Sequence, residues 1–515
     1  MKTGAKTQGE KRFIFGLDRE KIEKLIRGTA IAFALNHILV SVWVIVYNIG
    51  VPSARGLDKI YAGLVLAEIA LLMVYIAMNE TGAKQKIYGL FKEYFTKDQL
   101  LLGLLPLIYY VCLVYYAATE GIPNPEDNFK NFMDCLINVF VIYPLGRYYF
   151  KHKIPRTLEI IIHILMIGIT CYVVYVLYNV FNGVVLTTYF RGKIGMMKQD
   201  FGNGTEYHLQ INSHHNTTGA FSALFTLLSV SMAVWKKGIF RILYLVIAFI
   251  HSIVLVLSNS RSTFLSGCVF LALLAGVVVY FVIKHKWIDK RVLRWIISLI
   301  VVIGFFFILV TLRNSVFWIY GKCTGTGMVE QSLNVSENIG QAGENVTTET
   351  LSRDLEVSNL MGREIIWGCA IAGMVMNNRN LLIGVTPCGT GGVINELSNG
   401  QFPVYTHNQI LEIGLGLGVP AMMVFILWLV LLANRCVMIG FADETRMGVR
   451  HKCVPLLVLF LVMFNMFEAI LFFSNTFVGG VFMLTSAWCF EAARFGTVAK
   501  DGRFLGVFMQ RKESN

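Results

Sequence analysis

Long apolar stretches separated by short polar segments dominate the chain. A stretch of about 20 apolar residues is long enough to cross the hydrocarbon core of a bilayer as a helix. The pattern predicts twelve such spans, although the close pairs near residues 258 and 474 could instead be re-entrant. The predicted spans are 28–49, 60–78, 99–118, 132–150, 157–182, 217–235, 240–258, 262–284, 294–312, 408–433, 453–473 and 475–492.

The composition agrees with this pattern. Of 515 residues, 55% are hydrophobic and only 15% are charged, which is too little charge for a soluble protein of this length. We therefore expect an all-α, polytopic helical membrane protein with one large extracytoplasmic loop. The expected division is a basic N-terminus (1–27), nine spans (28–312), the loop (313–407), three spans (408–492) and a tail (493–515).

The distribution of basic residues predicts the orientation. If the N-terminus lies inside, the seven inner segments hold 33 of the 45 Lys and Arg residues, as the positive-inside rule requires. We therefore expect both termini in the cytoplasm, with the basic N-terminus as an anchor because no cleavage site follows the first span. The net charge of +13 is then explained by basic residues on the inner side, which set the orientation and face anionic lipid headgroups. Nucleic-acid binding is not indicated, because the charge does not form one patch.

Motifs for nucleotides and metals are absent from the sequence. There is neither a P-loop nor a dinucleotide-binding glycine fingerprint, and no CxxC or Cys/His spacing typical of zinc. We therefore expect no cofactor and no metal site. Most of the ten cysteines lie in apolar stretches, but Cys323 and Cys388 both fall in the large loop, where a disulfide is possible.

The large loop has two contrasting halves. Its first half, Met328 to Leu360, is polar, whereas apolar residues between Leu360 and Met376 recur with a helical period. Asn359 is a plausible N-cap of this helix and Asn377-Asn378 a plausible stop. The following glycine-rich run, Gly389 to Gly392, predicts a turn where backbone can approach a ligand. An amphipathic helix here could lie on the membrane and roof a cavity.

Three polar residues interrupt or border apolar stretches on the predicted outer side. Arg261 lies in a short polar Ser-Asn-Ser-Arg-Ser segment between two spans, Arg363 begins the amphipathic segment, and His407 precedes the tenth span. Each has an ordinary alternative, namely a snorkelling arginine, a surface charge and an interfacial histidine. Together, two fixed cations and a titratable imidazole suit an anionic, phosphate-bearing lipid substrate.

Other ionisable residues fall inside predicted spans, where each is costly and should face the bundle interior. Glu412 follows His407 by five residues, so on one shared helix the two side chains would point about 140° apart. Glu468 could bind substrate or, more simply, pair with a neighbouring helix. The full set is Glu68, Asp134, Glu159, His163, His251, Glu412 and Glu468.

Three blocks resemble those of the O-antigen ligase and O-antigen polymerase superfamily. Leu257 to Ser262 is similar to its Ser-x-Ser-Arg block, and Gly362 to Trp367, followed by Leu382-Ile383-Gly384, is similar to its Arg-x-x-x-Trp helix and glycine turn. Thr406 to Glu412, with the trailing glycines, is similar to its His-Asn-x-x-Leu-Glu block. The long first half of the loop and the Thr-Pro-Cys-Gly turn at 386–389 depart from the family pattern.

The resemblance implies a GT-C-like helical bundle in the bacterial inner membrane that serves surface-polysaccharide (lipopolysaccharide or capsule) biosynthesis. It implies an undecaprenyl-diphosphate-linked glycan as donor, a glycan or glycolipid as acceptor, and inversion at the anomeric carbon without metal or nucleotide. It also implies catalytic roles for Arg261, Arg363 and His407. Further candidates for substrate binding are Ser260, Asn408, Glu412, Trp367 and His215.

Several alternatives stay open at this point. His407 could accept the proton of the acceptor hydroxyl or could contact the diphosphate. Ligase and polymerase differ only in the acceptor, and the absence of any feature specific for a lipid-core acceptor favours polymerase slightly. A lipid-linked oligosaccharide flippase or another transporter would also need cations, but should have paired broken helices. A receptor or scaffold would not need the three residues to converge.

Overall fold

The computed structural model describes most of the chain from residue 96 to residue 495. The described ranges are 96–144, 146–147, 155–187, 193–201, 204–211, 215–286, 291–324, 349–350, 363–402, 404–441, 453–469 and 477–495, with a few single positions before residue 96. The predicted spans at 28–49 and 60–78, both terminal segments and the polar half of the large loop therefore lie outside the described residues or almost entirely so.

Within these ranges, seven helices are long and apolar enough to cross a membrane. This confirms a multi-pass helical membrane protein, and the total of twelve spans stays a prediction. The seven helices are α4 (Lys97–Thr119), α7 (Pro155–Phe181), α8 (His215–Trp235), α9 (Ile239–Leu257), α10 (Arg261–Lys286), α11 (Arg291–Thr324) and α17 (Val419–Phe441).

Shorter helices occupy the remaining apolar stretches. The fourth predicted span is divided between α5 (Pro125–Ile137) and a π-helical turn, η1 (Asn138–Ile142). The last two predicted spans contain α18 (Cys453–Phe464) and α19 (Phe477–Phe495). Near residue 258, α9 and α10 are two separate helices of full spanning length rather than a re-entrant pair.

The tenth predicted span, 408–433, is not one helix. It is divided into α16 (Gln409–Leu417) and α17, with a break at Gly418. Gly418 has a φ of 86°, and a Cβ there would lie 2.6 Å from the backbone of Leu382. Glycine is therefore required for both the backbone conformation and the close approach. The apolar run alone does not reveal this break, because both helices are apolar.

A small sheet departs from the all-α prediction. Strands β2 (Lys193–Phe201) and β3 (Gly204–Gln210) form an antiparallel hairpin, which β1 (Leu186–Thr187) extends on one side. On the other side β4 (Glu349–Thr350), which belongs to the large loop, pairs in parallel with β3. The segment between α7 and α8 and the large loop therefore meet through backbone hydrogen bonds.

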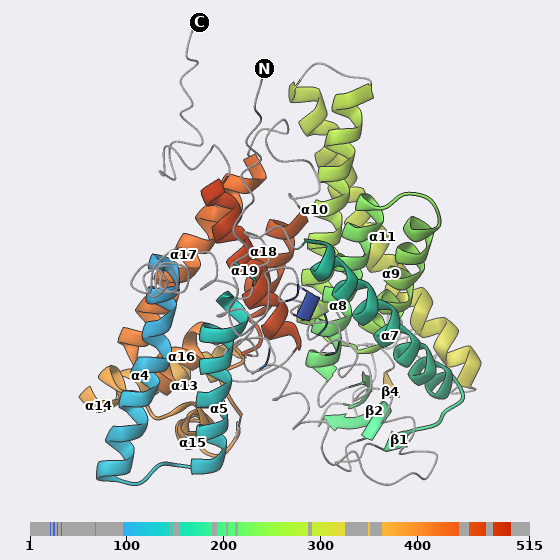
Figure 1. The fold of residues 1–515 in the computed structure, drawn as a ribbon. Coiled ribbons are helices and arrows are strands. Elements are labelled where there is room, and N and C mark those ends of the chain that lie inside the picture. Colours follow the sequence, from blue (N-terminus) through green and yellow to red (C-terminus); the bar gives the residue numbers. More distant parts are fainter. Residues whose placement is uncertain are drawn as a thin grey trace, which may run out of the picture.

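The helices form two groups on either side of α18 and α19 (Figure 1). Helices α7 to α11 lie above the sheet, whereas α4, α5 and α17 lie on the opposite side with the loop helices. Helix α18 packs against α8 and α10 in one group and against α17 in the other. Buried aromatic side chains fill the centre, including Phe225, Phe425, Trp428, Phe460 and Phe482.

The second half of the large loop is helical throughout most of its length. The predicted amphipathic helix is confirmed as α13 (Arg363–Val375), and Asn377 caps the next helix, α14 (Asn378–Leu382), rather than only ending the first. The glycine-rich run ends a 3-10 turn, η2 (Pro387–Gly389), and begins α15 (Thr390–Leu397), so the predicted turn is present only up to Gly389 and the rest of the run is helical. Close approach of a ligand to this backbone stays a prediction.

Hydrogen bonds connect the helical second half of the large loop to α4 and α5. The hydroxyl of Tyr116 donates to the carbonyl of Gly384 at 3.0 Å. Buried Asn128 donates to the hydroxyl of Thr386 at 3.1 Å and accepts from that of Tyr109 at 2.9 Å. These contacts join the loop to the bundle through buried polar groups, which are costly to leave unpaired.

Candidate functional site

The turn between α9 and α10 places Arg261 at the first position of α10. Asn259 turns the backbone with a φ of 53°, and the side-chain oxygen of Ser260 is buried without a hydrogen-bond partner among the described residues. The Nε of Arg261 is likewise buried, and no described residue accepts its hydrogen. A guanidinium with unused donors at a helix N-terminus favours an anion.

Arg363 occupies the corresponding first position of α13. Its Nη2 lies 3.5 Å from Oε1 of Glu468, and its side chain is 20% exposed. The guanidinium also lies over the ring of Phe467, with 6.0 Å to the centroid. One ion pair uses only part of the five donors of an arginine, so Arg363 retains hydrogen-bonding capacity toward a ligand.

His407 lies in a tightly held loop before α16. Its φ is 51°, and the helix begins only at Gln409, with Asn408 as N-cap. The expectation that His407 and Glu412 share one helix was therefore wrong. The Nδ1 of His407 lies 3.2 Å from Oε2 of Glu468, and Nε2 makes no hydrogen bond to a described residue.

The loop around His407 is fixed by its neighbours. The Asn408 side chain accepts from the amides of Ile410 and Leu411 at the start of α16. Glu412 accepts from the amide and the hydroxyl of Thr406, at 3.0 and 2.9 Å. The indole of Trp367 donates to the carbonyl of Thr406 at 3.0 Å. Asn408, Glu412 and Trp367 thus position the loop, and direct contact with substrate stays a prediction for each.

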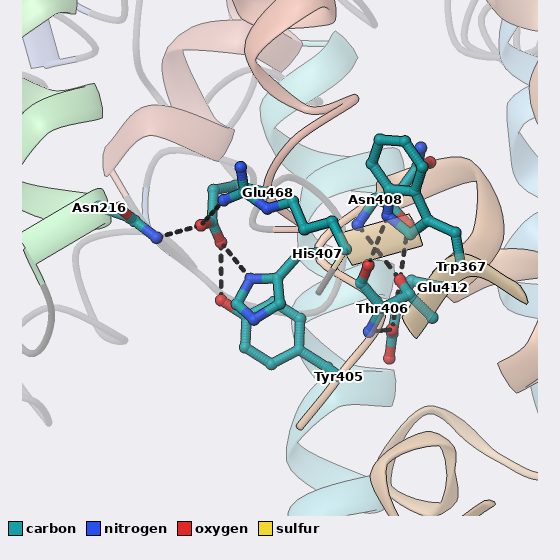
Figure 2. Close-up of polar contacts among 9 residues, drawn as sticks. Asn216, Trp367, Tyr405, Thr406, His407, Asn408, Glu412 and Glu468 are labelled. Atoms are coloured by element: carbon teal, nitrogen blue, oxygen red, sulfur yellow. Dashed lines mark hydrogen bonds and ion pairs between the residues drawn. The ribbon is translucent and has the colours of Figure 1, made fainter. Parts of the chain in front are cut away.

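Glu468 joins these elements (Figure 2). It lies beyond the end of α18, and its side chain is 1% exposed. Besides Arg363 and His407, it accepts from the hydroxyl of Tyr405 at 2.7 Å and from the side chain of Asn216 on α8. One buried carboxylate therefore collects partners from α8, from α13 and from the loop before α16.

The partners of Glu468 determine its charge. The Arg363 guanidinium, Nδ1 of His407, the Tyr405 hydroxyl and the Asn216 side chain all face this buried carboxyl group. A cation and several hydrogen-bond donors favour the charged form of a carboxyl group. Glu412 has no cation among its described hydrogen-bond partners, which are Thr390 and Thr406. The surroundings of Glu468 are therefore those of an ionised carboxylate.

An ionised Glu468 also determines the tautomer of His407. A carboxylate can only accept hydrogen bonds, so the 3.2 Å contact requires a proton on Nδ1 of the imidazole. In the neutral ring, Nε2 then carries a lone pair. The ring of Tyr405 packs against the imidazole with 4.2 Å between centroids, which further restricts its orientation.

Arg261 is connected to this cluster through α8. A Cβ built on Gly219 would lie 2.4 Å from the hydroxyl oxygen of Thr263 and 3.2 Å from the Cβ of Ser260, so α8 packs tightly against the start of α10. Asn216, which bonds Glu468, precedes Gly219 by about one helical turn. The structure thus joins Arg363 and His407 through Glu468, and Arg261 only by the packing of α8, without a hydrogen bond to either among the described residues.

The remaining candidates are also placed. His215 is the first residue of α8 and is buried, with its ring stacked 4.3 Å from that of His208 on β3. Cys323 and Cys388 are both free, so the possible disulfide does not form. Within the described part of the chain, no group of His, Cys, Asp and Glu side chains is arranged to hold a metal ion.

The sequence did not predict that Glu468 contacts both Arg363 and His407, nor that Asn216 and Tyr405 join them. Glu468 was predicted to bind substrate or, more simply, to pair with a neighbouring helix. It pairs with four groups distant in sequence, and substrate binding stays a prediction. The available signal was a carboxylate within an apolar run, which is expensive without partners. Asn216 directly follows the His214-His215 pair, and Tyr405 precedes the Thr-His-Asn block by one residue.

Residues 243–426 match the family model described as O-antigen ligase. The chain carries an O-antigen ligase domain. All three sequence blocks lie within it, so the resemblance is confirmed. Glu468 and Asn216 lie outside the matched residues, so segments on both sides of the O-antigen ligase domain contribute to this polar cluster. A comparison with curated proteins found no match.

Proposed function

We propose that this protein is a membrane glycosyltransferase that transfers or polymerises glycan from an undecaprenyl-diphosphate carrier at the extracytoplasmic face. Arg363 and His407, which come from separate blocks of the O-antigen ligase domain, contact the same buried carboxylate of Glu468. This convergence is the observation that supports the proposal most strongly. A protein without a reaction centre has no need to assemble these groups at one point.

The charges of the site suit a diphosphate. Arg261 and Arg363 carry two fixed positive charges, and Glu468 carries one negative charge. The excess of one positive charge, with guanidinium donors still unused, favours a polyanionic group. Both arginines lie at helix N-termini, whose exposed amides add to this preference. They can therefore stabilise a diphosphate leaving group as charge develops on it.

His407 is proposed as the general base. Its Nε2 removes the proton of the acceptor hydroxyl while the acceptor oxygen forms a bond to the anomeric carbon. The bond from that carbon to the diphosphate oxygen breaks, and its electron pair leaves with undecaprenyl diphosphate. Glu468 stabilises the imidazolium that forms, as the carboxylate of a catalytic triad does. Attack opposite to the leaving group gives inversion.

This transfer uses only groups of the protein and the activated donor. The energy comes from the sugar-diphosphate bond, in keeping with the absence of a nucleotide-binding motif in the sequence. The acceptor is either a lipid-anchored molecule or another lipid-linked glycan, and these two define ligase and polymerase. We place the reaction in the inner membrane with both termini cytoplasmic, as the distribution of basic residues indicates.

A purified-protein assay tests the proposal. Wild-type protein in detergent or nanodiscs is mixed with an undecaprenyl-diphosphate glycan and candidate acceptors, in the presence of a metal chelator. Transfer by the wild type, and its loss in Arg261→Ala, Arg363→Ala and His407→Ala, is the expected result. Full transfer by all three variants would refute the site. A change of acceptor in the same assay distinguishes ligase from polymerase.

A flippase is the alternative function. It would move the lipid-linked glycan across the bilayer without a new glycosidic bond. Reconstituted vesicles with a labelled lipid-linked glycan distinguish the two, since a flippase changes the accessibility of the label and a transferase changes its covalent attachment.

A further inference from the structure

The spanning helix α11 contains a buried arginine although much of the helix is exposed. Many large apolar side chains of α11 are exposed, for example Ile303, Phe307 and Leu312, as expected for a helix that faces lipid. Arg313 on the same helix is only 5% exposed. A guanidinium within a membrane span is costly and is retained where it faces polar partners inside the bundle.

Arg313 contacts the segment that leads into α10. Its Nη2 donates to the side-chain oxygen of Asn259 at 3.0 Å. Its guanidinium also lies over the rings of Phe264 and Phe317, with 5.8 and 5.5 Å to the centroids. Phe264 belongs to the first turn of α10 and Asn259 precedes that helix, so Arg313 contacts the chain on both sides of Arg261, the first residue of α10.

Asn259 is the residue through which this contact can act. Its φ of 53° is in the left-handed region, where asparagine is one of the few tolerated side chains. Its side-chain amide donates to the carbonyl of Tyr207 on β3 at 3.2 Å. Both polar atoms of the Asn259 amide are thus hydrogen-bonded, the oxygen to Arg313 on α11 and the nitrogen to the sheet. Asn259 lies two residues before Arg261.

We propose that Arg313 is a positioning residue for Arg261 and acts through Asn259. The backbone changes direction between the last residue of α9, Leu257, and the first of α10. Rotation at Asn259 within this short turn would displace the whole first turn of α10 and the Arg261 guanidinium with it. An error of about 1 Å in such a group can cost on the order of 100-fold in rate.

This inference rests on the proposed function, because it assumes that Arg261 binds the diphosphate. Two rival roles for Arg313 predict different behaviour. If Arg313 contacts the diphosphate itself, its effect adds to that of Arg261. If it only stabilises the bundle, its loss lowers the melting temperature and has no specific effect on diphosphate affinity.

The test is a double-mutant cycle measured by binding. Undecaprenyl diphosphate is titrated into wild type, Arg313→Met, Arg261→Ala and the double variant, because binding can be measured in inactive proteins. We expect Arg313→Met to weaken binding about tenfold in the wild type and not at all in the Arg261→Ala background. Equal weakening in both backgrounds, or none in the wild type, would overturn the inference.

Two further variants separate positioning from loss of stability. Asn259→Gly retains the left-handed backbone but removes both side-chain hydrogen bonds, and we expect it to weaken binding as Arg313→Met does. Arg294→Met is the matched control, because Arg294 lies on the same helix with its guanidinium over the ring of Tyr280. It should leave binding unchanged, and similar melting temperatures for both Met variants would rule out a merely structural effect.

Failure of the inference is distinguishable from failure of the proposed function. If the wild type does not bind undecaprenyl diphosphate, the proposed donor is wrong. If the wild type binds it and Arg261→Ala binds it more weakly, but Arg313→Met binds normally, the proposed function stands and the positioning role of Arg313 is refuted.

Discussion

The Nδ1 of His407 lies 3.2 Å from Oε2 of Glu468, although 61 residues separate them. Glu468 is 1% exposed and receives three further polar partners, so its position is fixed independently of the histidine. The pair therefore resembles the carboxylate-oriented imidazole of hydrolytic triads in geometry. Its consequence is a defined tautomer, with Nε2 as the acceptor of a proton.

Replacement of Glu468 by glutamine tests this relationship. The amide of Glu468→Gln is nearly isosteric but uncharged, so it can neither stabilise an imidazolium nor neutralise Arg363. We expect the rate of glycan transfer to fall on the order of 100-fold or more, with a smaller change in KM for the donor. Single-turnover and steady-state kinetics measure the two effects.

Glu364→Gln is the matched control for that substitution. Glu364 follows Arg363 on α13 and is exposed, with no described ion pair to the site. Its replacement should leave both rate and affinity unchanged. Equal losses in the two variants would show that any change of charge near α13 impairs transfer, which contradicts a specific role for Glu468.

The stability of the fold should depend on pH through the same carboxylate. Protonation of Glu468 removes the negative charge that pairs with Arg363, so its contribution to the free energy of unfolding is present where the carboxylate is ionised and is lost in acid. Melting temperatures of wild type and Glu468→Gln should thus differ at neutral pH and converge in acid; a constant difference throughout would contradict an ionised Glu468 in the folded protein.

The spanning helices could be predicted because a helix that crosses a membrane requires a long apolar run, which is visible in the sequence. The sheet could not, since β4 has only two residues and is defined by its partner β3 rather than by its own pattern. The break at Gly418 was also hidden, because it depends on backbone contact with Leu382 in a distant loop. Hydrophobicity identifies a helix but not where two segments must touch.

For the candidate site, the two arginines and the histidine could be proposed from the sequence because each interrupts or borders an apolar stretch. The sequence did not identify how they are connected. Glu468 is one of several intramembrane carboxylates in sequence, and only the folded chain distinguishes it from Glu412, which bonds Thr390 and Thr406 instead. Pairings between residues hundreds of positions apart, such as Asn216 with Glu468, leave no local signal.

The bond from Asn216 to Glu468 predicts different effects for two substitutions. Asn216→Ala removes one donor, whereas Asn216→Asp places a second carboxylate beside Glu468, and like charges this close disfavour ionisation of both. We therefore expect transfer at neutral pH to fall roughly tenfold further in the Asp variant than in the Ala variant. The difference in transfer rate between the Asp and Ala variants should become smaller in acid, where the two carboxylates share a proton. A pH–rate comparison of the two variants measures this, and parallel profiles would exclude direct contact with Glu468.

Gly219 provides the tightest test of how Arg261 is connected to the rest of the site. A Cβ at this position would lie 2.4 Å from the hydroxyl oxygen of Thr263 and 2.9 Å from that of Ser258, so Gly219→Ala must displace these hydroxyl groups or α8 itself at the start of α10. Such overpacking costs about 1–3 kcal/mol. Gly368→Ala on α13 is the control, since a Cβ at that position would have nothing within 4 Å, and alanine there should be neutral or stabilising. We expect Gly219→Ala alone to lower both the melting temperature and glycan transfer. If it instead transfers glycan at the wild-type rate, the packing of α8 against the Arg261 turn does not control the position of that arginine.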